Sequence, residues 1–434
     1  MRLNIFSLIA AGLFLLLATP CVADMPAPSD EIRKAAEQGD AVAQFTLGFA
    51  YAKGLGVTRD DAEAAKWFRK AAEQGNAAAQ GILGLMYRTG QGVTRDDVEA
   101  VKWFRKSAEQ SNAVAQYTLG MIYHDGRGVA RDDAEAVKWL RKAAEKGNAA
   151  AQFDLGLIYN GGDGMTRDYA EAAKWFRMAA EQGHAGAQGL LGFAYGSGQG
   201  VTRDYAEAAK WLRKAAEQDE AIGQYGLGGI YRDGQGLTRD DAEAVKWTRK
   251  AADQGFAPAQ FNLGAMYRTG QGVTRDFTEA VKWTRKAGEQ GHAAAQYTLG
   301  MIYYNGQGVT QDGVEAVKWI RKAAERGFEA AQLNLGWAYA KGVGVTRDYA
   351  EAAKWFRKPA DQGHAAAQFY LGLMYRDGQG VARNYAFAYM WLSLAAAQNY
   401  EKARQTLDNL EKKVTPQQRD EAQRMAREWK PIHN

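Results

Sequence analysis

Cysteine and histidine are scarce in this chain. Of its 434 residues one is a cysteine, Cys21, and five are histidines. A disulfide needs two cysteines, and zinc sites are built from clustered cysteine and histidine ligands, so neither feature is expected. The sequence also has no HExxH, no Gly-x-Ser-x-Gly and no phosphate loop with its lysine. We therefore predict no metal site, no cofactor and no catalytic residue, in a protein that is not an enzyme.

Blocks of like charge are also missing. The 55 Lys and Arg residues and the 50 Asp and Glu residues give a formal net charge of +5, and the two signs are interleaved along the chain. Proteins that bind DNA or RNA gather their basic residues on one face or one arm. Nucleic acid is therefore not an expected partner.

Long apolar runs are absent except near the start, in residues 1–23. There an apolar run from Ile5 to Ala18 precedes the small residues Cys21 and Ala23, which predicts a secretory signal peptide cleaved after Ala23. Two alternatives are a lipid anchor on Cys21 and a membrane span, but the run is shorter than the roughly 20 residues that a span needs. We expect a periplasmic or secreted protein that does not span a membrane.

What the chain does contain is a repeat of 36 residues, first seen in 41–76. Nine more copies follow, starting at Ala77, Ala113, Ala149, Ala185, Ala221, Ala257, Ala293, Glu329 and Ala365. Every copy keeps a tryptophan: Trp67, Trp103, Trp139, Trp175, Trp211, Trp247, Trp283, Trp319, Trp355 and Trp391. A unit this small cannot bury its own aromatic residues, so neighbouring copies must stack to close a core.

One unit is predicted to be a helical hairpin. In its first half Ala43, Leu47 and Tyr51 recur at the spacing of one helix face, which predicts helix A over 41–53. Two glycines two residues apart then favour a turn. Asp60 with Glu63, or Thr58 with Asp61, is placed to cap helix B, which runs to about Gln74. Asn76 can cap the next helix A. Stacked hairpins of this kind predict an all-α fold, an α/α superhelical solenoid.

The repeat pattern A-x-x-x-L-G-x-x-Y-x-x-G-x-G-V-x-x-D, followed by A-x-x-W-x-x-K-A-A-x-x-G, resembles the Sel1-like repeat, a relative of the tetratricopeptide repeat. The resemblance covers residues 41–400. Local departures are Ser111, Asp219 and Glu220 at the end of helices B, and Pro359 inside one. The resemblance implies adaptor work: assembly of envelope complexes, scaffolding of polysaccharide secretion or contact with a host protein. One branch of the family interacts with penicillin and carries paired cysteines, which are absent here.

The ends of the array are expected to be capped, since a solenoid exposes its core there. Residues 24–40 look like half a unit that covers the first end. In the tenth unit Phe387 and Met390 replace charged residues of helix B, so that helix is expected to be covered. Residues 401–434 supply two amphipathic helices as terminal capping helices, and a docking helix for a partner is the alternative.

The residues that change between copies are the candidate binding residues. Positions five, nine and twelve of the unit share one face of helix A, which we call the candidate face. Its candidate partner-binding residues are Phe45, Phe49, Arg88, Tyr117, Met121, His124, Tyr225, Arg232, Phe261, Arg268, Tyr297, Tyr304, Trp337 and Arg376. Aromatics and arginines are favoured in binding hot spots. The aromatics at positions five and nine fit core packing equally well. The arginines at position twelve are expected to face solvent in the groove, and the alternative is that their charges complement the ends of helices A.

Units five and six are unusually rich in glycine in helix A. The glycines Gly189, Gly196, Gly226 and Gly229 remove side chains from this face, and each costs a helix roughly 1 kcal/mol relative to alanine. They favour either a hinge or a pocket. Three histidines, His184, His292 and His364, share one junction position two or three units apart and are best explained as helix caps.

Together these observations predict an exported, non-enzymatic scaffold that binds a protein or peptide in the groove formed by helices A. One alternative is a protein that binds cell-wall glycan or exopolysaccharide, with its aromatics stacked on sugars. Another is a penicillin-interacting hydrolase, for which the sequence offers no nucleophile.

Overall fold

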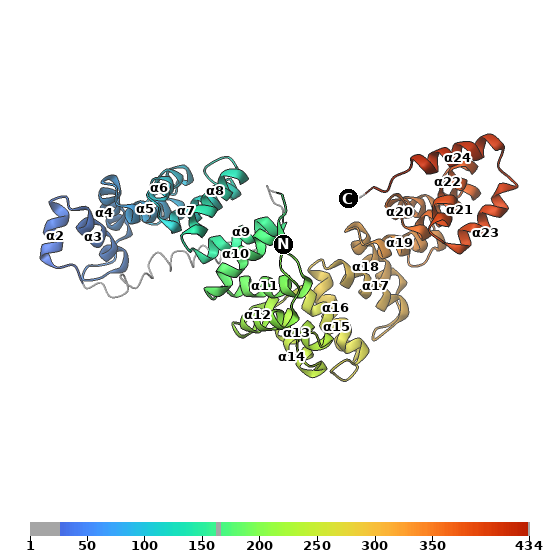
Figure 1. The fold of residues 1–434 in the computed structure, drawn as a ribbon, viewed down its shortest axis with the longest axis horizontal. Coiled ribbons are helices and arrows are strands. Elements are labelled where there is room, and N and C mark those ends of the chain that lie inside the picture. Colours follow the sequence, from blue (N-terminus) through green and yellow to red (C-terminus); the bar gives the residue numbers. More distant parts are fainter. Residues whose placement is uncertain (1–26, 162–165, 433–434) are drawn as a thin grey trace. The chain divides into compact units, whose positions relative to one another are not determined.

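The structure is a computed structural model that describes residues 27–161 and 166–432. In these residues every regular element is a helix (Figure 1). The predicted signal peptide, residues 1–23, and Cys21 within it lie outside the described residues.

The first half-unit is helix α2 (Asp30–Glu37). The helix A and helix B pairs of the ten units are α3 (Ala41–Lys53) and α4 (Asp61–Glu73), α5 (Ala77–Thr89) and α6 (Asp97–Glu109), α7 (Ala113–Asp125) and α8 (Asp133–Glu145), α9 (Ala149–Gly161) and α10 (Tyr169–Glu181), α11 (Ala185–Ser197) and α12 (Tyr205–Glu217), α13 (Ala221–Asp233) and α14 (Asp241–Asp253), α15 (Ala257–Thr269) and α16 (Phe277–Glu289), α17 (Ala293–Asn305) and α18 (Gly313–Glu325), α19 (Glu329–Lys341) and α20 (Tyr349–Asp361), and α21 (Ala365–Asp377) and α22 (Tyr385–Ala397). The chain ends with α23 (Glu401–Glu411) and α24 (Pro416–Glu428).

The chain divides into two compact units, residues 1–226 and 227–434, with the division inside α13. Each helix packs against the next from α3 to α12 in the first and from α14 to α22 in the second. The all-α solenoid of stacked hairpins predicted from the repeat is confirmed.

Short-range signals in the sequence fix where each helix starts. The Asp60 carboxylate accepts hydrogen bonds from the backbone N–H groups of Ala62 and Glu63, which caps α4. Asn76 accepts from Ala79 N–H and caps α5 in the same way. A side-chain oxygen at these positions satisfies amides that have no partner inside the helix. The predicted caps are confirmed at both helices of the unit.

The local departures from the repeat keep its geometry. Ser111 and Asp219 stand where other units have glycine, and both adopt the left-handed conformation, with φ of 67° and 63°. Pro359 lies inside α20, which continues to Asp361. The stacking of neighbouring units therefore holds these residues in the backbone path that the repeat requires, although their intrinsic preferences are different.

Two sets of polar contacts join the helices where neighbouring units meet. A buried glutamine of helix A, such as Gln80, donates to a carbonyl at the end of the preceding helix B, Ala72 O. Gln80 also accepts from Gln110, the residue after its own helix B, at 2.7 Å. An arginine of helix B donates to the tyrosine hydroxyl of the next helix A, as Arg321 does to Tyr339 at 2.6 Å. These contacts recur along the array and fix the stacking of one hairpin on the next.

The last helix of the array is covered in part: Met390 is 5% exposed, as expected, whereas Phe387 remains 38% exposed. Helix α22 packs against both α23 and α24 at the C-terminal end (Figure 1), and Trp429 meets Trp391 edge to face with ring centroids 6.3 Å apart. Thr415 and Gln418 form the reciprocal capping box that begins α24. The end of the core is thereby closed within the chain.

Candidate functional site

The outer face of helix B is nearly the same in the first nine units. In the first nine units a Glu and a Lys three residues apart form an exposed ion pair, as Glu243 and Lys246 do at 2.7 Å. A second lysine, such as Lys286, lies over the repeat tryptophan, with Nζ 4.0 Å from the centre of the Trp283 ring. Exposed pairs of this kind contribute little to stability and carry no information that separates one unit from another. This face is therefore a poor candidate for selective binding.

The candidate face of helices A differs from unit to unit in its exposure. Most of its candidate residues are half-buried: Phe45, Arg88, Tyr117, Met121, His124, Tyr225, Arg232, Phe261, Tyr297 and Arg376. Phe49 is 3% exposed and belongs to the core. Tyr304 and Trp337 are 44% and 36% exposed, and Arg268 is exposed as well. Tyr304, Trp337 and Arg268 are therefore accessible to solvent, whereas Phe49 is buried.

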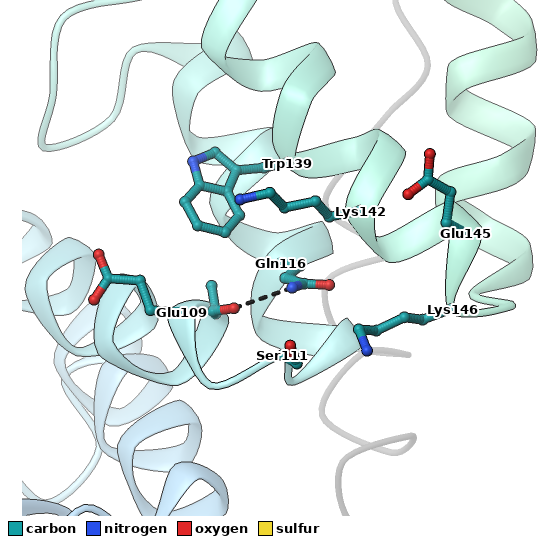
Figure 2. A pocket seen from close by; sticks show the side chains of 8 residues that line it. Glu109, Ser111, Gln116, Trp139, Lys142, Glu145 and Lys146 are labelled. Carbon is teal, nitrogen blue, oxygen red and sulfur yellow. Dashed lines mark hydrogen bonds between the residues drawn. The ribbon is translucent and has the colours of Figure 1, made fainter.

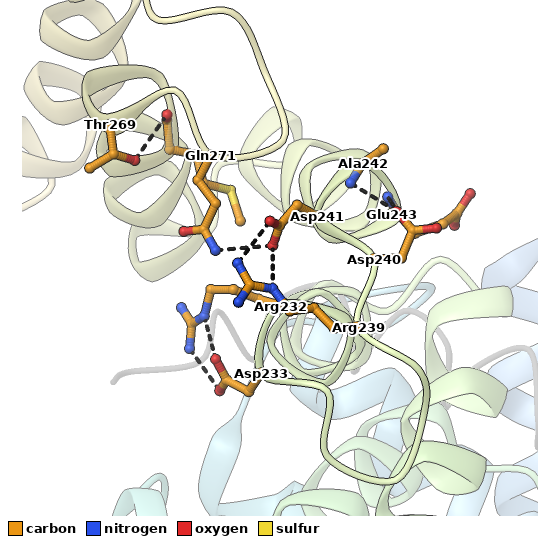
Figure 3. Close-up of polar contacts among 10 residues, drawn as sticks. Arg232, Asp233, Arg239, Asp240, Asp241, Ala242, Glu243, Thr269 and Gln271 are labelled. Atoms are coloured by element: carbon orange, nitrogen blue, oxygen red, sulfur yellow. Dashed lines mark hydrogen bonds and ion pairs between the residues drawn. The ribbon is translucent and has the colours of Figure 1, made fainter.

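The arginines at position twelve have three different environments. Arg232 and Arg376 each form an ion pair with the aspartate that follows, Arg232 with Asp233 at 2.7 Å (Figure 3). Arg268 alone is exposed as expected, because Arg232 and Arg376 are half-buried and so is Arg88. The Arg88 guanidinium lies over the ring of Phe104, 5.6 Å from the centroid, and burial lowers the pKa of Arg88. A long stem and a planar head allow an arginine to pack on an aromatic face in this way.

In the second compact half of the chain, residues 227–434, the candidate face carries an aromatic cluster across α17, α19 and α21. The amide of Asn334 donates to the Tyr297 hydroxyl at 2.9 Å. Trp337 meets Tyr370 edge to face, with centroids 4.9 Å apart, and Lys341 Nζ lies 5.4 Å from the Trp337 ring centre. These contacts hold the rings in place while part of each remains open to solvent, an arrangement that suits contact with another molecule.

In the first compact half of the chain, Tyr117 of α7 and Asp154 of α9 stand at the positions of Tyr297 and Asn334, so a carboxylate replaces the amide. The Tyr117 hydroxyl donates to Asp154 Oδ2 at 2.9 Å. Burial raises the pKa of Asp154 to about 6, partly offset by that hydrogen bond and by the charge of His124. His124 Nδ1 is 3.1 Å from Asp133, which also pairs with Arg131. Tyr117 and His124 were candidates from the sequence, whereas Asp154 was missed because it lies at position six.

The glycines of units five and six lie in helices as long as those of the other units, each of 13 residues. A Cβ on Gly226 would lie 2.5 Å from Leu212 Cδ2, and one on Gly189 would lie 3.3 Å from Ile222 Cγ2. Gly196 and Gly229 are roomier, and nothing lies within 4 Å of a Cβ built on Gly229. Close packing therefore accounts for two of these glycines, and the hinge or pocket stays a prediction.

A pocket of about 500 Å³ lies away from the candidate face, between α6, α7 and α8 (Figure 2). One of its walls is Gln116, which is 3% exposed and whose Oε1 has no hydrogen-bond partner. In unit two the glutamine at the position of Lys146, Gln110, donates to the corresponding oxygen of Gln80. The same oxygen also lacks a partner in Gln296, where Arg326 stands at that position, and in Gln332. The pocket is thus a local gap in the glutamine contacts and contains no nucleophile with a paired base.

Comparison with known proteins identifies the family. The Sel1 repeat profile matches ten consecutive segments of 36 residues that together cover residues 41–400. The chain is a Sel1 repeat protein. The recognition made from the repeat pattern is confirmed, and no curated protein sequence matches the chain. Sel1 repeats and related tetratricopeptide-like folds typically serve as non-catalytic scaffolds that mediate contacts between proteins.

Two solved structures of Sel1 repeat proteins are similar to it. One is a protective antigen, c5321, present in uropathogenic Escherichia coli strains: it is 37% identical, with a TM-score of 0.57, over 92% of this chain and 94% of that one. The other is a Sel1 repeat protein from Oxalobacter formigenes, 32% identical with a TM-score of 0.50, over 56% of this chain and 96% of that one.

The histidines of this Sel1 repeat protein act as structural caps where they were predicted to. His184 and His292 each accept a hydrogen bond through Nδ1 from the third backbone N–H of the following helix A, both at 3.2 Å. Across residues 27–161 and 166–432 no three His, Cys, Asp or Glu side chains gather as a metal would require. In the same part of the chain no helix combines the length and the apolar composition of a membrane span.

Proposed function

We propose that this Sel1 repeat protein is an exported, non-enzymatic scaffold that binds a protein or peptide partner on the candidate face of its helices A. The observation that carries the proposal is the contrast between the two faces. Helix B repeats one charge pattern in nine units, whereas helices A present aromatic and basic side chains that differ from unit to unit. A selective partner needs such differences, since identical units offer it no preferred register.

Export is proposed on the basis of residues 1–23, whose pattern is that of a signal peptide. The similar E. coli protein, described as a protective antigen, supports a location outside the cytoplasm. An envelope assembly partner or a host protein is therefore the partner class that we favour.

A crosslinking pull-down with matched variants tests the proposal. The first variant changes Tyr304 and Trp337 to alanine, removing the two exposed aromatics of α17 and α19. The control changes Lys282 and Lys318 to alanine, two exposed residues of helices B in the same part of the chain. We expect a partner that the wild type and the control recover and that the aromatic variant loses. Equal recovery by all three proteins would refute a role for the candidate face.

Glycan binding is a second candidate, favoured by the exposed rings of Tyr304 and Trp337, because sugars stack on open aromatic faces. The same three proteins distinguish it. If the wild type and the control recover cell-wall or polysaccharide fragments without a protein, and the aromatic variant does not, glycan binding is favoured over protein binding.

A further inference from the structure

One charged side chain lies beside the candidate face, at position six of helix A, and is hydrogen-bonded to Tyr117 of that face. Between the second and the eleventh residue of helix A, the ten units carry a single charged side chain, Asp154 of α9. The other nine units have neutral residues at its position: Thr46, Ile82, Thr118, Leu190, Gly226, Asn262, Thr298, Asn334 and Tyr370. The lone carboxylate is therefore a property of one unit and plays no part in the repeat itself.

The Asp154 carboxylate is held in place but is not neutralised. Its Oδ2 accepts the Tyr117 hydroxyl at 2.9 Å, and the side chain is partly exposed. Among the described residues no Lys, Arg or His forms an ion pair with it. The nearest histidine, His124, is itself hydrogen-bonded to Asp133. No cation of residues 27–161 and 166–432 thus forms the ion pair that would normally accompany a desolvated charge.

The same face shows that the hydrogen bond needs no charge. In units eight and nine Asn334 and Tyr297 occupy the positions that correspond to Asp154 and Tyr117, and they are joined at the same distance, 2.9 Å. A neutral amide therefore makes this contact between neighbouring helices A. Burial raises the pKa of Asp154 to about 6, because desolvation disfavours the ionised carboxyl. The charge has no structural task here that an amide could not perform.

We propose that Asp154, positioned by Tyr117 of the candidate face, receives a cationic side chain, lysine or arginine, of a peptide segment bound on that face. The inference rests on the proposed function and names the chemistry of the partner. The charge complementarity is local, because the neighbouring positions of helices A are uncharged. A cation placed against Asp154 would form a hydrogen-bonded ion pair in a partly desolvated site, where such pairs contribute to affinity and fix the register of an extended segment.

The test uses a phage-displayed library of random twelve-residue peptides. The library is selected in parallel against the wild-type chain, the variant Asp154→Asn and the control Asp377→Asn. Asp154→Asn reproduces the neutral arrangement of Asn334. Asp377 is an acid of helix A that Arg376 already neutralises, so its loss should leave the selected peptides unchanged. We expect the pools of the wild type and of the control to be enriched at least twofold in Lys and Arg relative to the Asp154→Asn pool.

A selected peptide then provides a thermodynamic cycle. Replacing its key lysine with norleucine should weaken binding to the wild type roughly tenfold to a hundredfold, the range for a hydrogen bond to a charged group. The same replacement should have little effect on binding to Asp154→Asn, because the two changes remove one interaction.

The outcomes separate this inference from the proposed function. Pools of equal Lys and Arg content from the wild type and Asp154→Asn would overturn the cation site and leave peptide binding standing. A library that neither protein enriches would overturn peptide binding and the cation site together.

Discussion

Replacing Asp154 by asparagine should make α9 more stable at neutral pH. The pKa of Asp154 rises from 3.8 to about 6 on folding, mainly because the carboxyl is desolvated. Each tenfold change in proton affinity corresponds to about 1.4 kcal/mol, so the ionised form costs the folded state roughly 2 to 3 kcal/mol. An amide avoids most of this cost and keeps a hydrogen bond to Tyr117, as Asn334 does with Tyr297. We expect a gain of about 2 kcal/mol.

The dependence on pH follows from the sign of the shift. The folded state holds the Asp154 proton more tightly than the unfolded state does, so the cost is absent below about pH 4, grows up to about pH 6 and is complete above it. The difference between Asp154→Asn and the wild type should follow the same course. Tyr117 and His124 are the titratable groups that act on this carboxyl, and both are unchanged in the variant.

Hydrogen exchange resolved to single helices is the suitable assay, because repeat arrays open locally and one global unfolding energy describes them poorly. At pH 7 the α9 amides of Asp154→Asn should exchange roughly 30-fold more slowly than those of the wild type, and helices far from α9 should be unchanged. Asn334→Asp provides the reciprocal control, with faster exchange expected in α19. Equal exchange of α9 in the wild type and Asp154→Asn at pH 7 would refute the argument that this charge strains the fold.

Four further predictions concern the repeats and the C-terminal helix α24. Lys146→Gln should restore the missing donor to Gln116 Oε1 and slow exchange in α7 by about fivefold, near 1 kcal/mol; unchanged exchange would mean that this oxygen is satisfied otherwise. Gly200→Ala should destabilise its turn by more than 2 kcal/mol, because φ is +74° and the new Cβ would lie 1.9 Å from Tyr169 O. Gly229→Ala, with nothing within 4 Å of the new Cβ, should stabilise α13 by about 0.5 to 1 kcal/mol. Thermal melting checks both glycine variants, since the melting temperature should fall for Gly200→Ala and rise for Gly229→Ala. Thr415→Ala removes the capping box of α24 and should cost about 1 kcal/mol, seen as faster exchange in its first turn.

Most of the fold can be predicted from the sequence, because the signals that start and end each helix lie within one repeat and recur from copy to copy. The caps at Asp60 and Asn76 depend on residues two or three positions apart, which a single sequence displays directly. The contacts between units are different. Arg321 and Tyr339 are 18 residues apart, and their hydrogen bond cannot be predicted from the residue types without the geometry in which neighbouring hairpins stack.

The candidate site was predictable only in outline. The helix face that varies between units could be read from the repeat alignment, but exposure depends on how deep each position lies between neighbouring helices A. Phe49 and Trp337 share position nine, yet one is core and the other is open to solvent. Arg88 was misjudged because a solvent role was assigned by residue type, whereas Phe104 provides it with a surface to pack on. The uniqueness of Asp154 was visible in the sequence and required only a comparison of charges at position six.

The polar contacts between neighbouring units also bear on how such a chain lengthens. An additional hairpin inserted among the inner copies would find the donors and acceptors it needs on both sides, because Gln80, Gln110 and the Arg and Tyr of neighbouring copies recur in the same places. The two ends offer no such place, since α2 packs against α3 at one end and α22 packs against α23 and α24 at the other. Duplication of an inner copy would therefore extend the array without cost to its ends, and would duplicate with it whatever that copy presents to a partner.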